Sequence, residues 1–215
     1  MIRNLIMATN LQISFEPFVP NDQKSFDDFY RIYADSISPV EQKPRAMIAA
    51  MASLPEYRIL LARSGGVVIG LSVIFEPADG SFCLLEYMAV DAGHRNAGAG
   101  AALFRHGIEV TGTPMLLEVD SEIDATPDLA IRHRRQGFYR RLGCRRIEGL
   151  SYRLPWPGLP AMDLLVHLPS GMSQISKPQL EGWLRVVYQK VYHRAPDDPR
   201  IAEMMAPVTD PVGLV

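Results

Sequence analysis

A glycine-rich turn that opens a helix carries the residue types and spacing most suited to chemistry in this chain. The turn comprises Arg95, Asn96, Ala97, Gly98, Ala99 and Gly100, and an apolar helical pattern follows it. The first N–H groups of a helix have no partner within the helix, and with the positive end of the helix dipole they form an anion site. Gly98 and Gly100 lack a Cβ, so a phosphate could approach the main chain closely.

The turn follows an apolar run at residues 84–90 that predicts a buried strand and contains one acid, Glu86. A carboxylate in such a run is costly unless it lies at a polar site, so Glu86 is a candidate general base. A salt bridge between Glu86 and an arginine of the segment 132–141 is the structural alternative. The sequence leaves both open.

The pattern Arg95-x-x-Gly98-x-Gly100, placed after a strand that ends Met88-Ala89-Val90, resembles the acyl-CoA signature of the GNAT acetyltransferase superfamily. The resemblance implies that the amides of the loop bind the pyrophosphate of acetyl-CoA. It also implies that the backbone of the preceding strand pairs with the pantetheine arm. A dinucleotide fingerprint is disfavoured, because its third glycine position is Leu103.

A second segment, Phe138-Tyr139-x-x-Leu142-Gly143, is similar to the fourth-helix pattern of the same superfamily. The resemblance implies that Tyr139 protonates the leaving thiolate. Arg132 stands where the family often has asparagine, which puts the coenzyme A contacts of that asparagine in doubt.

Acyl transfer from a thioester to an amine needs a base for the amine, donors for the carbonyl oxygen and an acid for the thiolate. The resemblance implies Glu86 as the base, since members use a glutamate on this strand, and a backbone N–H near Met88 or Ala89 as the oxyanion donor. The leading hypothesis is therefore an acetyl-CoA-dependent N-acetyltransferase that transfers directly to the amine. The alternative is a non-catalytic acyl-CoA-binding regulatory domain.

Short apolar runs separated by turn residues predict the fold. Strands are expected at residues 57–63, 67–75 and 82–90 in hairpin succession. A helix over 98–111 then leads to a strand at 115–119, which makes a parallel neighbour. The class is α/β, with a mixed, mostly antiparallel sheet and helices on both faces. The resemblance implies that the parallel pair splays apart and that acyl-CoA lies in the gap.

The resemblance covers residues 10–168, which are assigned to the acetyltransferase domain, and residues 169–215 form a C-terminal helical appendage and tail. The appendage carries one apolar face that includes Trp183 and Leu184. This face could dock on the chain's own core or on a second subunit as a homodimer. Residues 195–215 contain four prolines and are expected to be loosely ordered.

The composition of the whole chain restricts the classes of partner. The 215 residues carry a formal net charge of −2, which gives no general attraction to nucleic acid or to an anionic membrane. No apolar run reaches the ~18 residues that a transmembrane helix needs. Cys83 and Cys144 are expected to be free thiols, which favours a cytoplasmic location. No metal site is expected, because no His/Cys cluster has ligand spacing.

The acceptor is the least determined part of the reaction. Aromatic side chains at residues 26–33 and the acidic segment 118–128 favour an amine. The arginines at 132–135 would favour an acceptor that also carries a carboxylate. We expect a small-molecule amine, because the chain has no basic tail for a polymeric anion.

Overall fold

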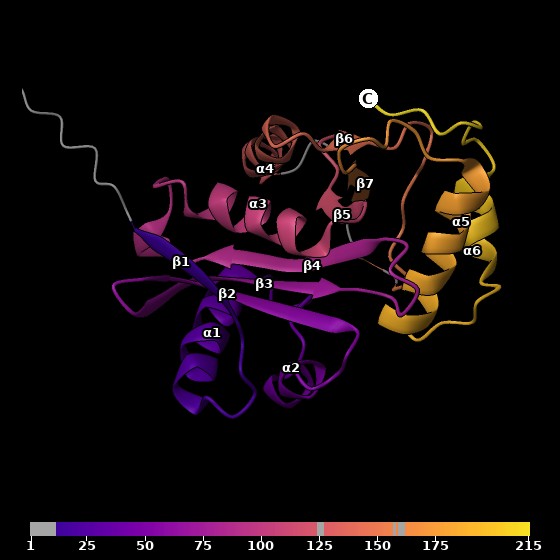
Figure 1. Ribbon diagram of the computed structural model, residues 1–215. Coiled ribbons are helices and arrows are strands. Elements are labelled where there is room, and N and C mark those ends of the chain that lie inside the picture. The colour runs from indigo at the N-terminus through magenta and orange to yellow at the C-terminus, as the bar shows by residue number, and fades with distance from the viewer. Residues whose placement is uncertain (1–11, 124–126, 157, 159–161) are drawn as a thin grey trace, which may run out of the picture.

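The computed structural model describes residues 12–123, 127–156, 158 and 162–215, and Figure 1 shows the chain arranged around a twisted sheet. Residues 10 and 11, at the expected domain start, and residues 124–126 of the acidic segment lie outside the described residues. Within the described part, none of the helices combines the length and the apolar character needed to cross a membrane.

The described strands form one mixed sheet. They are β1 (Ile13–Pro17), β2 (Tyr57–Ser64), β3 (Val67–Phe75), β4 (Cys83–Val90), β5 (Met115–Asp120), β6 (Arg145–Arg146) and β7 (Met162–His167), in the spatial order β1-β2-β3-β4-β5-β7-β6. Among the described strands, β4 and β5 pair in parallel and the other neighbouring strands pair antiparallel. The predicted α/β class and mostly antiparallel sheet are confirmed. Strand β6, which follows α4, is only two residues long.

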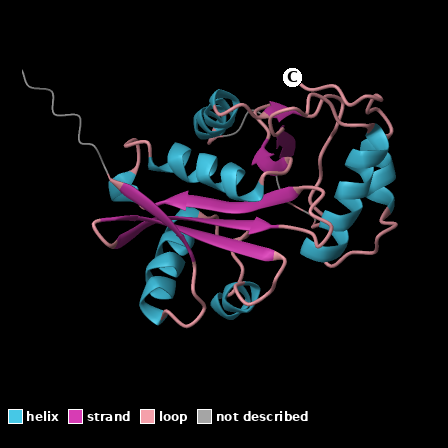
Figure 2. Cartoon of the chain, in the orientation of Figure 1, coloured by secondary structure: helices cyan, strands magenta, loops and turns pink. Residues whose placement is uncertain are grey.

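Helices cover both faces of the sheet and one of its ends (Figure 1 and Figure 2). The helices are α1 (Gln23–Ser36), α2 (Arg45–Met51), α3 (Ala99–Thr111), α4 (Leu129–Arg141), α5 (Lys177–Val186) and α6 (Pro199–Met205), with a short 3-10 turn at Ala92–His94 and a π-helical turn at Val187–Val191. The first two lie on one face, α3 and α4 on the other, and α5 and α6 pack at the end of the sheet.

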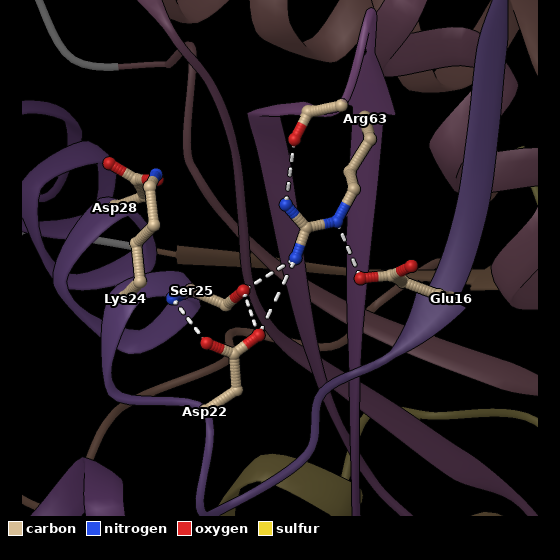
Figure 3. Close-up of polar contacts among 7 residues, drawn as sticks. Glu16, Asp22, Lys24, Ser25, Asp28 and Arg63 are labelled. Carbon is tan, nitrogen blue, oxygen red and sulfur yellow. Dashed lines mark hydrogen bonds and ion pairs between the residues drawn. The ribbon is translucent and has the colours of Figure 1, made fainter.

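Arg63, near the end of β2, fixes the start of α1 against the sheet (Figure 3). Its Nε donates to Oε1 of Glu16 on β1 at 2.5 Å, and its Nη2 donates to the hydroxyl of Ser25. The carboxylate of Asp22 accepts from the backbone N–H of Ser25 at 3.0 Å and so caps the helix. This network holds the start of α1 against β1 and β2.

An extra residue in β4 separates this strand from β5. Leu85 and Tyr87 pair with consecutive residues of β3, so Glu86 between them forms a β-bulge. A bulge bends its strand and increases the local twist. Parallel pairing with β5 ends at Leu85 and Leu117, although β4 continues to Val90. The splayed pair is thus confirmed, and the bulge is its local cause.

The apolar face of α5 docks on the chain's own sheet. Trp183 is 3% exposed and stacks on Phe82, with ring centroids 5.5 Å apart. Leu184 and Val187 are buried in the same cluster as Leu84 of β4. The apolar face of α5 is therefore covered by the chain's own sheet and gives no support for a second subunit. A homodimer stays a prediction.

The C-terminal segment is ordered, so the expectation of a loose tail is wrong. Asp198 caps α6 by accepting from the N–H of Arg200, and Pro199 occupies the first turn, where its missing N–H costs nothing. At the end of the chain, Arg146 and Val215 exchange backbone hydrogen bonds of 2.7 and 3.0 Å. Pro199 therefore begins a helix rather than interrupting one. The domain division after residue 168 stays a prediction.

Candidate active site

Two glutamates stand at the opening between β4 and β5, one on each strand. Leu85 and Leu117 form the last parallel pair, and Glu86 and Glu118 are the next residues along their strands. Main-chain groups of β4 beyond this point, at Met88 and onward, have no pairing with β5. The geometry places two carboxylates where an unpaired strand edge begins.

The carboxylate of Glu86 is paired with a lysine rather than with the arginine that the alternative predicted. Its side chain is 4% exposed, and Oε2 accepts from Nζ of Lys43 at 2.7 Å. Lys43 also donates through Nζ to the hydroxyl of Tyr87 at 3.0 Å, and through its backbone N–H to the hydroxyl of Tyr33 at 2.7 Å. Oε1 of Glu86 is buried without a hydrogen-bond partner among the described residues. The hydroxyl of Tyr57 also interacts with this carboxylate, and burial first, then Glu86, raises the pKa of Tyr57 well above its ordinary value.

Glu118 accepts hydrogen bonds from the hydroxyls of two tyrosines. Tyr152 donates to Oε1, and Tyr192 donates to Oε2. Burial raises the pKa of Glu118 to about 7, the two hydroxyls act in the opposite direction, and the charge of Glu86 adds to the rise. A carboxyl group with this pKa can accept or release a proton near neutral pH.

Sequence reasoning missed Glu118 as an individual site residue and treated it as part of the acidic segment 118–128. A usable signal was present, since the triplet Leu-Leu-Glu occurs both at residues 84–86 and at residues 116–118. In the structure the leucines of the two triplets pair in order, which places the two glutamates together.

Tyr139 lies across the sheet from Glu86, on the face covered by α3 and α4. Its ring packs against Phe104 and Phe138, with centroid distances of 5.5 and 5.1 Å. It is buried in the same cluster as Leu85, which precedes the bulge. Burial raises the pKa of Tyr139 to about 12, so its phenol keeps its proton at neutral pH.

The glycine loop is shaped as an open anion site. Gly98 is the N-cap of α3 with φ +84°, and a Cβ built there would meet nothing within 4 Å. At Gly100 a Cβ would touch Val90 Cγ2 at 3.6 Å, an ordinary contact. Thus Gly98 is required by its backbone conformation, whereas Gly100 is not. The first amides of this 13-residue helix remain free of intrahelical partners by geometry.

The other loop residues hold the loop in place. Arg95 donates from Nε to the carbonyl of Val90 at 3.0 Å and from Nη2 to the hydroxyl of Ser36 at 3.2 Å, which anchors the loop to β4 and α1. Asn96 has a left-handed φ of 64°, Ala97 is exposed, and Ala99 is 1% exposed beneath the helix start. The loop therefore presents backbone amides, and no acidic or bulky side chain, at the start of α3.

Two arginines of α4 form ion pairs with acids at the end of β5 and directly after it. Arg135 pairs with Asp120 at 2.6 Å, and Arg140 pairs with Glu122. The buried Arg132 donates to the carbonyl of Ser121 at 3.1 Å. These contacts order the segment, and they reduce the case for an arginine-bound carboxylate on the acceptor.

Comparison with known proteins identifies the family of the chain that forms this site. A family model described as the acetyltransferase (GNAT) family matches residues 26–144, which is more than half of the chain. The chain belongs to this family. As a GNAT protein it is an N-acetyltransferase enzyme, and its family uses acyl-CoA as the donor. A search of curated proteins found no match.

Solved structures share the GNAT fold at low sequence identity. A protein described as a GNAT-family acetyltransferase from Bacteroides thetaiotaomicron is 21% identical with a TM-score of 0.70, over 84% of this chain and 99% of that one. The ribosomal-protein-S18-alanine N-acetyltransferase of Escherichia coli is 16% identical with a TM-score of 0.55, over 75% and 97%. An aminoglycoside 6'-N-acetyltransferase complexed with coenzyme A is 16% identical with a TM-score of 0.56, over 71% and 94%.

The matched family segment contains Glu86, the loop at residues 95–100, Glu118 and Tyr139, but it ends before Tyr152 and Tyr192. The matched segment therefore contains both carboxylates but neither of the tyrosines that donate to Glu118. The roles of the individual residues remain proposals.

Proposed function

We propose that this enzyme transfers the acetyl group of acetyl-CoA directly to the amino group of a small molecule. The observation that carries the proposal is the end of parallel pairing at Leu85 and Leu117, where Glu86 and Glu118 face an unpaired strand edge. Acetyl-CoA supplies the activated thioester. The amides of residues 98–100 and the β4 edge at Met88, Ala89 and Val90 are the parts of the chain that would hold it.

Glu86 is the proposed base for the acceptor. An amine at neutral pH is largely protonated and has no lone pair for attack, so a carboxylate must remove a proton first. Oε1 of Glu86 is buried and unpartnered in the described part of the chain, and an ammonium group would satisfy it. Lys43 occupies the other oxygen and holds the carboxylate in one orientation.

Tyr139 is the proposed acid for the leaving thiolate. As the amine nitrogen bonds to the carbonyl carbon, the carbon–sulfur bond breaks and the sulfur gains a negative charge. A buried phenol with a raised pKa remains protonated until such a strong base appears beside it. A backbone N–H of β4 near Met88 or Ala89 would stabilise the carbonyl oxygen.

The acceptor is proposed to be a small amine. The opening holds two carboxylates against one lysine, Lys43, and this balance favours a cationic acceptor. The net charge of −2 gives the whole chain no general attraction for a polymeric anion. Of the aromatic side chains at residues 26–33, Phe26, Phe29 and Tyr33 are buried in the hydrophobic core. A cytoplasmic location also stays a prediction; Cys83 and Cys144 are free thiols.

A thiol-release assay tests the proposal. The enzyme is incubated with acetyl-CoA and a panel of amines, amino acids, aminoglycosides and peptides, and free coenzyme A is followed by a thiol reagent. We expect release with at least one small amine, together with an acetylated product. Release with peptides alone would overturn the small-molecule class. Calorimetric binding of coenzyme A without release for any acceptor would favour the regulatory alternative.

A further inference from the structure

Glu118 is held by a residue that lies 74 positions away in the chain, in the C-terminal appendage. Tyr192 is 7% exposed and donates its hydroxyl to Oε2, while Tyr152 of the β6–β7 connection is 2% exposed and donates to Oε1. The two hydroxyls thus occupy one oxygen each. They fix the rotation of the carboxylate as well as its position.

The appendage presents Tyr192 through a change of helix type. After α5, residues Val187–Val191 form a π-helical turn, and the N–H of Tyr192 donates to the carbonyl of Val187 at 3.2 Å. A π-turn accommodates one more residue than an α-turn and recurs at functional sites. The ring of Tyr192 is enclosed by Tyr188 at 5.8 Å and Trp156 at 5.0 Å between centroids.

The groups facing Glu118 come from four parts of the chain. Glu86 and Tyr87 lie on β4, and Lys43 lies on the α1–α2 loop. Tyr152 lies on the connection before β7. Tyr188 lies on the π-helical turn, and Tyr192 follows it directly. Lys43 and the hydroxyls of Tyr152 and Tyr192 favour the charged form of Glu118, while Glu86 and burial disfavour it. Burial first, then Glu118, raises the pKa of Tyr152 well above its ordinary value, and that of Tyr192 likewise. Both therefore act as donors at all working pH values.

We propose that the C-terminal appendage is part of the acceptor site, with Tyr192 and Tyr152 as positioning residues that keep Glu118 charged and aimed at the opening between β4 and β5. Glu118 then binds the ammonium group of the acceptor beside Glu86. This inference rests on the proposed function, since it assigns a second carboxylate to the same reaction. It makes the appendage, which lies beyond the matched family segment, necessary for the chemistry.

Tyr192→Phe tests the inference without knowledge of the acceptor. The ¹³Cδ signal of Glu118 is followed by NMR over pH in protein labelled on glutamate, and its assignment comes from Glu118→Gln. Loss of one hydroxyl donor should raise the apparent pKa of Glu118 by about one unit. Tyr152→Phe should act alike. Tyr188→Phe is the matched control, because its hydroxyl donates to the carbonyl of Arg153 instead. An unmoved pKa in both test variants, or an equal shift in the control, would overturn the inference.

The rate of acetyl transfer supplies the second readout once the amine panel has given an acceptor. In Tyr192→Phe the acid limb of kcat/KM should move to higher pH, with about tenfold loss below the wild-type pKa and recovery at alkaline pH. A purely structural defect would lower the rate equally at every pH and would count against the positioning role. If wild type releases no thiol with any amine, the proposed function fails, while the NMR titration still decides the link between Tyr192 and Glu118.

Discussion

At the scale of single residues, Glu118 couples the stability of the enzyme to pH. Burial, the largest cause, raises its pKa from the ordinary 4.5 to about 7. Between these values the folded chain binds more protons than the unfolded chain, so the free energy of unfolding falls as pH rises through this window. The full effect is about 3 kcal/mol at most. The charged form of Glu118 at the candidate active site therefore lowers the free energy of unfolding.

Glu118→Gln should remove this cost. We expect the variant to gain thermal stability relative to wild type at pH 8 and to gain little at pH 5, where Glu118 of the folded protein is already protonated. Thermal unfolding at both pH values measures the difference. Glu109→Gln is the control, because the Glu109 side chain is 76% exposed. An equal change in Tm at both pH values would show that Glu118 is not titrating in this range.

At the scale of elements, the start of α3 is the feature on which donor binding depends. Gly98 and Gly112 flank this helix and share a left-handed backbone, with φ +84° and +65°, and open space beside each. Substitution causes similar backbone strain at the two ends. Only Gly98 lies at the proposed pyrophosphate site.

Gly98→Asp should lower the affinity for coenzyme A by about tenfold or more, because its carboxylate would repel the pyrophosphate. Gly112→Asp should bind coenzyme A as wild type does. Calorimetry on both proteins, after their unfolding temperatures have been compared, gives the answer. Unchanged affinity in Gly98→Asp would remove the basis of the donor assignment.

Much of the fold at this scale could be predicted from the sequence. Helix α3 and strands β2, β3 and β4 lie within about one residue of their expected bounds, because hairpin turns and helix signals are local. The partner of Glu86 could not be predicted, since Lys43 reaches it from a loop 43 positions away. The contacts of Tyr152 and Tyr192 with Glu118 could not be predicted for the same reason, because they depend on how α5 docks on the sheet.

At the scale of the whole molecule, the appendage and the sheet share one core. Ile201, Met204 and Met205 of α6 are buried in the same cluster as Leu116 and Leu164 of the sheet. Removing the appendage would uncover sheet residues that are now fully buried. Deletion of residues 169–215 is therefore expected to destabilise the sheet that forms the proposed donor site.

Met204→Ala should destabilise the whole enzyme by about 2–4 kcal/mol, since it leaves a cavity in this shared core. Met47→Ala, at a methionine that is 48% exposed on α2, should cost under about 0.5 kcal/mol. Denaturant unfolding of the two variants is the measurement. If Met204→Ala is as stable as Met47→Ala, the appendage is not part of the cooperative core.

The rate of acetyl transfer by Glu86→Gln, measured over pH with an accepted amine, tests the central claim most directly. We expect unchanged affinity for coenzyme A and a rate at neutral pH lower by about 10²–10⁴-fold. The loss should shrink at high pH, where more of the amine is already free. An unchanged rate with an unchanged pH profile would contradict the account and leave deprotonation to another group.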